Sequence, residues 1–192
     1  MDALVVYGSL IDKSELTKGG FPLDSTRPVV LRGFGRVFCQ EPSWRPDRGE
    51  QRAVLNVISA EHHWLNALLI SGLDDRFLAA VDEREKGYDR IEVTPSCLRD
   101  YHPLSTKPRN IYTHAGKEHK QSDSILPNAS YLSICLEGAK QWGEGVYNDF
   151  LDSTFIKDDI FESLRRMNES LCPRDHLPIR SSSPSREDEP GK

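Results

Sequence analysis

Short apolar runs with short connections between them limit what this chain can fold into. Each run is bounded by turn residues and is either apolar throughout or alternating, which predicts β-strands. The runs lie at residues 3–6, 29–31, 36–39, 53–58, 65–70, 90–93 and 109–113. Gly33 and Gly35 predict a bulge or tight bend, and His62 and His63 are expected in a loop between two strands. So many strands with short connections favour a curved or closed sheet.

Amphipathic helices are predicted to flank these strands. The clearest spans residues 73–86, where Asp74 is the cap and Gly87 the stop. Further helices are predicted at residues 128–142, 146–151 and 160–167, with a short one inside 11–20 that Ser14 caps. Residues 172–192 are rich in Pro, Ser and charged residues, so we expect a disordered tail after one α+β domain of residues 1–171.

Composition narrows the class of protein. The chain has 192 residues, enough for one domain with a core, and a net charge of −5 with a pI near 5.7. A nucleic-acid binder needs a basic face, so we predict no nucleic-acid partner. No apolar stretch is long enough to cross a bilayer and no signal sequence is present, which predicts a cytoplasmic chain with no membrane partner.

No cysteine or histidine pattern predicts a metal site or a disulfide framework. The cysteines are far apart in sequence and are predicted to be free thiols. They are Cys39, Cys97, Cys135 and Cys172. His114, Glu118 and His119 superficially resemble metal ligands, but the polar stretch 114–124 predicts a solvated loop instead.

The first strand ends in a glycine turn, Tyr7-Gly8-Ser9-Leu10. Glycine permits a positive φ and a close approach between backbone and ligand. Consecutive N–H groups in such a turn form an anion site, suited to a carboxylate or a developing oxyanion. The alternative is that Gly8 and Ser9 form only a turn after the strand.

The helix at 73–86 directs one acidic side chain toward the core. On a step of about 100° per residue, Glu85 falls within roughly 40° of the centre of the apolar face. Burial raises the pKa of a carboxyl, which makes it useful as an acid or base near neutral pH. The alternatives are that Glu85 reaches solvent at a frayed helix end, or that it pairs with Arg84 or Arg90.

Four segments in this order resemble the gamma-glutamylcyclotransferase superfamily, and within it the ChaC-like and AIG2-like members. They are the turn 7–10, the strand 31–38 with Gly-Phe-Gly-Arg, the acidic helix end and strand 82–90, and the helix start 127–132 followed by Gly138 and Ala139. The resemblance implies a small mixed β-barrel with flanking helices. Where other members carry two glycines before the tyrosine, this chain has Lys86-Gly87-Tyr88, which leaves the substrate open.

The resemblance also implies a reaction: the α-amine of a γ-glutamyl group attacks its own γ-carbonyl, giving 5-oxoproline and a released amine. The partner is then a small γ-glutamyl substrate, such as glutathione or a γ-glutamyl amino acid, and no metal or organic cofactor is implied. By position, Glu85 is the catalytic acid and base. The implied substrate-binding residues are Tyr7, Gly8, Ser9, Leu10, Arg36 and Tyr88.

Other interpretations remain open at this point. Arg36 could form a surface ion pair, and Tyr88 could simply pack in the core. The same fold could hold an acidic small ligand without turnover, because a fold does not fix a function. It could also act on a γ-glutamyl group attached to a larger molecule.

Overall fold

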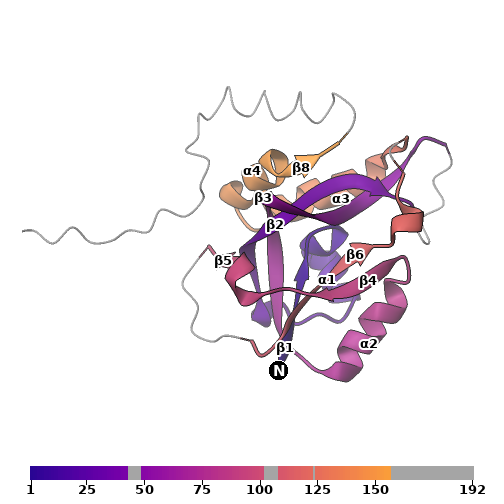
Figure 1. The fold of residues 1–192 in the computed structure, drawn as a ribbon. Coiled ribbons are helices and arrows are strands. Elements are labelled where there is room, and N and C mark those ends of the chain that lie inside the picture. The colour runs from indigo at the N-terminus through magenta and orange to yellow at the C-terminus, as the bar shows by residue number, and fades with distance from the viewer. Residues whose placement is uncertain (43–48, 102–107, 123, 157–192) are drawn as a thin grey trace, which may run out of the picture.

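In the computed structural model, which describes residues 1–42, 49–101, 108–122 and 124–156, one mixed β-sheet runs through the molecule (Figure 1). The strands are β1 (Asp2–Val6), β2 (Thr26–Gln40), β3 (Gln51–Leu73), β4 (Tyr88–Glu92), β5 (Leu98–Asp100), β6 (Ile111–Gly116), β7 (Leu126–Pro127) and β8 (Thr154–Phe155). The α-helices are α1 (Lys13–Lys18), α2 (Asp75–Arg84), α3 (Ala129–Lys140) and α4 (Glu144–Asp152). Short 3-10 turns are η1 (Ser9–Ile11), η2 (Leu23–Ser25), η3 (Pro95–Cys97) and η4 (Glu118–Lys120).

The strand order is β4-β6-β1-β3-β2-β5, with β7 on β3 and β8 on β2. β1 pairs in parallel with β6 and antiparallel with β3, so the sheet is mixed. Among the described residues the edge strands β4 and β5 do not pair with each other, and the sheet is open. The α+β class with flanking helices is therefore confirmed, whereas the closed β-barrel is not.

The long ribbon of β2 and β3 differs from the predicted strands. Residues 53–58 and 65–70 belong to one strand, β3, and 29–31 and 36–39 belong to β2. The pairing shifts from Arg32 opposite Trp64 to Phe34 opposite Ser59, at Gly33 with φ 81°. His62 and His63 thus lie in an exposed bulge of a continuous strand, and the predicted loop is wrong. The predicted glycine bend is confirmed at Gly33. The left-handed φ found there is a conformation that glycine permits.

The helices begin where capping side chains are available. Asp74 caps α2 by accepting from the Phe77 N–H at 2.7 Å, as predicted. The cap of α1 is Asp12 rather than Ser14, because the Asp12 carboxylate accepts from two backbone N–H groups. The predicted loop at 114–124 is wrong in its first part, since β6 continues to Gly116 and buries His114.

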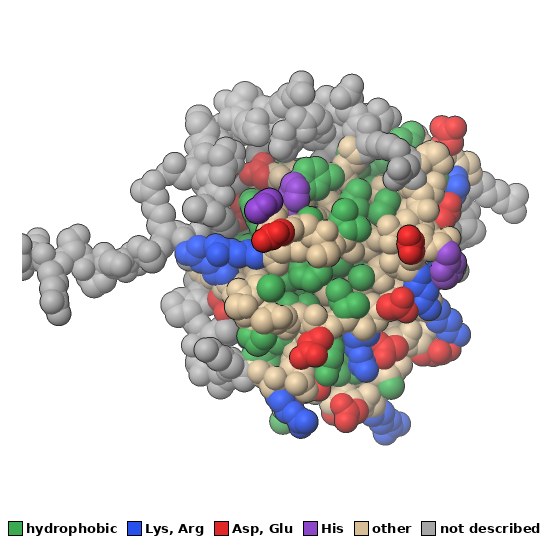
Figure 2. Space-filling view, viewed as in Figure 1, with side chains coloured by type: hydrophobic (Ala, Val, Ile, Leu, Met, Phe, Trp, Pro, Cys, Tyr) green, Lys and Arg blue, Asp and Glu red, His purple; other side chains and the backbone are tan. Residues whose placement is uncertain are grey.

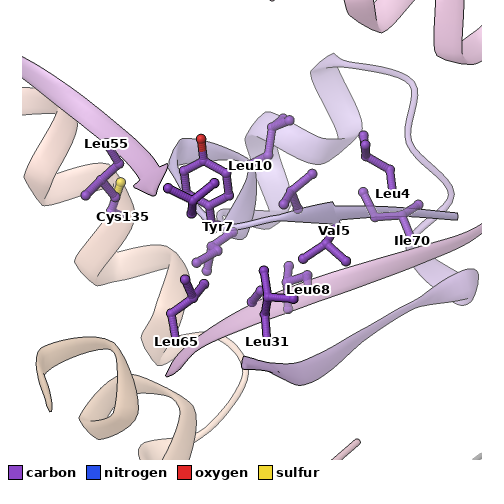
Figure 3. Packing of buried hydrophobic residues seen from close by; sticks show 14 of the residues in the cluster. Leu4, Val5, Tyr7, Leu10, Leu31, Leu55, Leu65, Leu68, Ile70 and Cys135 are labelled. Carbon is purple, nitrogen blue, oxygen red and sulfur yellow. The ribbon is translucent and has the colours of Figure 1, made fainter. Parts of the chain in front are cut away.

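The core is built from the central strands. Leu4, Leu31, Leu65 and Ile70 from β1, β2 and β3 are fully buried, and Figure 3 shows them in one cluster with Tyr7 at the end of β1. On the face drawn in Figure 2, acidic and basic side chains lie intermixed around apolar surface. This packing fixes the end of β1, where the site described below lies.

Several predictions concern other parts of the chain. Cys39, Cys97 and Cys135 form no disulfide with one another in the described part of the chain. None of the described helices combines the length and apolar character that a bilayer crossing requires. The helix at 160–167, the tail at 172–192 and Cys172 lie outside the described residues.

Candidate active site

A pocket lies at the end of β1 where α2, α3, β3 and β6 converge. Its polar lining consists of Tyr7, Ser9, Glu85, Tyr88, His114 and Tyr131, and Gly8 and Leu10 also line it. Apolar side chains from β1, β3 and α2 complete the wall. The empty volume is about 440 Å³, part of it open solvent, which suits a small ligand. All sequence-predicted site residues except Arg36 meet here.

Gly8 is required at the turn because of a close approach. Its φ is −111°, so the left-handed conformation that glycine permits is not used. A Cβ added to Gly8 would lie 2.3 Å from the Tyr131 Oη. Tyr131 comes from the first turn of α3, which Asn128 caps through a 2.8 Å hydrogen bond to the Tyr131 N–H. The missing side chain at position 8 therefore makes room for a hydroxyl in the pocket.

The N–H groups of the turn have different partners. The Ser9 N–H donates to the Tyr131 Oη at 3.3 Å. Within the part of the chain that the structure describes, the N–H groups of Gly8 and Leu10 donate to no protein acceptor. Two donors at the pocket wall are thus available for an anionic group, next to a third that is bound to a tyrosine hydroxyl.

Glu85 occupies the cap position just after α2, where a tight turn holds the backbone. Its N–H donates to the Val81 carbonyl and its carbonyl accepts from the Tyr88 N–H, each at 2.8 Å. The Gly87 carbonyl accepts from Gln40 Nε2 and from the Lys117 N–H, both at 3.0 Å. The helix ends one residue before Glu85, so its side chain projects from a fixed turn rather than from a frayed helix end.

The Glu85 side chain is 21% exposed and faces the pocket. The one ion pair that it makes with a described residue is weak, since the Arg84 Nε lies 3.5 Å from Oε1. Burial raises the pKa of Glu85, and the charges of Arg84 and His114 only partly oppose this. Arg90, the other predicted partner, contacts Asp82 instead at 3.4 Å. The site therefore holds a carboxyl that takes up a proton more readily than an exposed glutamate does.

Three tyrosines complete the polar wall as neutral hydroxyls, because burial raises the pKa of Tyr7, Tyr88 and Tyr131. The Tyr7 Oη donates to the His114 carbonyl at 2.6 Å. The Tyr88 Oη donates to the Leu55 carbonyl at 2.9 Å. The Val57 backbone also hydrogen-bonds to Tyr7. A hydroxyl oxygen has two lone pairs, so each of the two tyrosines can still accept a hydrogen bond from a ligand.

Arg36 does not line the pocket, so its predicted role in substrate binding is not supported, and neither is a surface ion pair. Its side chain is fully buried and donates to the backbone or side chains of Tyr7, Asn66, Phe150, Ser153 and Thr154. The Arg36 Nη1 reaches the Tyr7 carbonyl at 3.3 Å. Arg36 therefore supports the end of β1 from behind.

Two pocket residues were not singled out from the sequence. Tyr131 lies in the predicted helix 128–142, and the signal in the sequence is that a phenol buried on an apolar helix face needs a polar partner. His114 lies in the stretch 114–124, for which the sequence predicts a solvated loop, whereas the structure buries it on β6. Among the described residues no group of three or more His, Cys, Asp or Glu side chains is arranged to hold a metal ion.

Comparison with known proteins identifies the fold. No family model and no curated protein matches the sequence. A solved structure described as a gamma-glutamyl cyclotransferase superposes with a TM-score of 0.57, at 14% identity, over 86% of this chain and 98% of that one. The chain has the gamma-glutamyl cyclotransferase fold.

Two further structures share this gamma-glutamyl cyclotransferase fold. An uncharacterized protein from Homo sapiens gives a TM-score of 0.57 at 16% identity, over 85% of this chain and 97% of that chain. YkqA from Bacillus subtilis gives 0.54 at 16% identity, over 88% of this chain and 54% of YkqA. Identity at this level shows the fold alone, so function has to be argued from the pocket.

Proposed function

We propose that this protein is a gamma-glutamylcyclotransferase, which cyclises the γ-glutamyl group of a small peptide or amine to 5-oxoproline and releases the amine. The observation that carries the proposal is the Glu85 carboxyl, whose pKa is raised by burial, in the same pocket as the N–H groups of Gly8 and Leu10, which donate to no acceptor among the described residues. A base and an anion site in one small pocket are what this reaction requires.

The reaction begins with a proton transfer. At neutral pH the substrate α-amine is an ammonium, which has no lone pair for attack. The ionised Glu85 takes one of its protons, and the freed nitrogen attacks the γ-carbonyl carbon. A five-membered ring forms while the carbonyl π electrons move to oxygen. The substrate brings its own nucleophile at high effective concentration, so no protein nucleophile is needed.

Attack leaves a second proton on the ring nitrogen. Collapse of the tetrahedral intermediate breaks the bond to the leaving nitrogen, and the protonated Glu85 returns its first proton to that nitrogen. The regenerated carboxylate then takes the second proton from the ring nitrogen and passes it to the released amine, which leaves as an ammonium. The two nitrogens are bonded to the same carbon, so one carboxyl can serve both. The N–H groups of Gly8 and Leu10 bind the α-carboxylate or the oxyanion, where fixed backbone dipoles stabilise negative charge. The hydroxyls of Tyr7, Tyr88 and Tyr131 border this space and orient the substrate.

The test is release of 5-oxoproline from glutathione, γ-Glu-Cys, other γ-glutamyl amino acids and ε-(γ-glutamyl)lysine. We expect Glu85→Gln to lower kcat/KM about 100- to 10,000-fold, the range for loss of a general acid–base group. Glu83→Gln is the matched control, because the Glu83 side chain is 73% exposed on the same helix end and pairs with Lys86. It should leave the rate unchanged.

The pH profile adds a second criterion. Because the ionised Glu85 is the active form and its pKa is raised, kcat/KM should rise with pH along a limb above the ordinary carboxyl value of 4.5. Full activity of Glu85→Gln, or no turnover of any donor, would show that the mechanism is wrong. Binding of a γ-glutamyl compound without turnover would instead identify a binding protein for an acidic ligand.

A further inference from the structure

One side-chain pair at the pocket wall has no role in the reaction above. The His114 Nε2 lies 2.9 Å from the Asp82 Oδ1, which joins strand β6 to helix α2. The His114 side chain is 9% exposed and lines the pocket. The second Asp82 oxygen faces the Arg90 Nη1 of β4 at 3.4 Å. One carboxylate on α2 thus contacts two neighbouring strands.

This contact lies where it can control the position of Glu85. Asp82 is in the last turn of α2 and precedes Glu85 by three residues. Only Leu78 and Val81 of this helix are buried, and Figure 1 shows α2 on the outside of the fold beside β4. The hydrogen bond from His114 to Asp82 adds a side-chain attachment between the helix end and the sheet, beside the backbone bonds that hold the turn at Gly87.

The charges around His114 favour an interaction with Glu85. Around the pair, Arg90 on β4 contacts Asp82, Glu85 lines the same pocket as His114, and the hydroxyls of Tyr7 and Tyr88 in that pocket are neutral. The positive charge of Arg90 already balances the negative charge of Asp82. The charge of His114 lowers the pKa of Glu85 and so opposes the effect of burial.

We propose that His114, held by Asp82, is a positioning residue for Glu85: it fixes the end of α2 at the pocket and presents a positive charge to the carboxylate. This rests on the proposed function, in which Glu85 is the base. In its imidazolium form, His114 favours the ionised carboxylate that takes the substrate proton. It thereby extends activity to lower pH than burial of Glu85 alone would allow.

The first test is the pH profile of His114→Gln, whose amide can still donate to Asp82 but carries no charge. We expect the acid limb of kcat/KM to move to higher pH by about half a unit, and the rate along that limb to fall about threefold, for a single charge partly screened by solvent. Asp89→Asn is the control, since Asp89 lies on β4 but pairs with Lys117 and not with the pocket. A fall in kcat of equal size at every pH, with the limb unmoved, would overturn the proposal.

The second test needs neither turnover nor a folded His114 variant. The His114 ring is followed by NMR between pH 4 and 9 in the natural protein, in Glu85→Gln and in the control Glu83→Gln. An interaction between two charges acts equally on both partners. The midpoint of the NMR titration curve of the His114 ring should therefore move to lower pH by about half a unit in Glu85→Gln only. An unchanged midpoint overturns the proposal, whereas failure of every γ-glutamyl donor counts only against the proposed function.

Discussion

Arg36 is a fully buried charged residue and Glu85 a largely buried one, and they differ in how many partners the protein gives them. Arg36 makes six hydrogen bonds to carbonyl, amide and hydroxyl oxygens, and its guanidinium stacks on Phe150 with 3.9 Å to the ring centre. Burial lowers its pKa to about 9, which leaves it charged at neutral pH. Glu85 has a 3.5 Å contact to its sequence neighbour Arg84 and an open pocket in front of it.

This difference separates structural from reactive charge. A buried ion whose donors are all used holds elements together, because any movement breaks several hydrogen bonds at once. A buried ion with few partners changes its affinity for protons instead, and can pass a proton to a ligand. Arg36 therefore has a structural role at the end of β1, whereas Glu85 is placed to react with a ligand in the pocket.

The largest effect expected from this comparison is on stability at Arg36. Arg36→Met should lower the free energy of unfolding by about 3–5 kcal/mol, because it leaves several buried acceptors without a donor. Arg36→Lys should recover little of this, since an ammonium cannot reproduce the planar fork of donors. Urea unfolding followed by circular dichroism measures both, with the exposed Arg32→Met as control. A loss below 1 kcal/mol would contradict the structural role.

A smaller effect on stability is expected at Gly8, where the lack of a side chain makes room for the Tyr131 hydroxyl. Gly8→Ala should cost about 1–3 kcal/mol, because its Cβ would lie 2.3 Å from the Tyr131 Oη. Adding Tyr131→Phe should restore much of the loss, since the next tyrosine atom is at an ordinary 3.5 Å. Gly145→Ala in α4 meets open space and is the control. If the two substitutions at positions 8 and 131 are simply additive in thermal unfolding, the close approach is not what requires glycine.

The smallest effect is a gain in stability from removing Glu85. A carboxyl whose pKa is raised by folding holds its proton more tightly in the folded state, so the free energy of unfolding falls as pH rises through that range. Glu85→Gln should therefore be more stable than the natural protein at pH 8 and differ little at pH 4. Chemical denaturation at both pH values checks this. Equal differences at the two pH values would show that Glu85 is not a strained carboxyl.

Local patterns in the sequence predicted the elements, but contacts distant in sequence decided the site. The apolar runs, Asp74 as a cap and the burial of Glu85 follow from neighbouring residues, and each agrees with the structure. The role of Arg36 does not, because its partners are Tyr7, Asn66 and residues 150–154, which only the tertiary fold brings together. His114 was missed for the same reason, since Asp82 on α2 is what makes its position at the pocket informative.

The parallel pairing of β1 with β6 has a consequence for biosynthesis. Tyr7 and His114 are 107 residues apart in sequence, and the hydrogen bond between them closes one side of the pocket. The ribosome makes β1 first, yet its parallel neighbour emerges only after most of the domain has been translated. Contacts of such separation form slowly and late in folding. A nascent chain therefore carries an apolar N-terminal segment with one vacant edge, and it acquires a pocket only when β6 arrives to cover that edge.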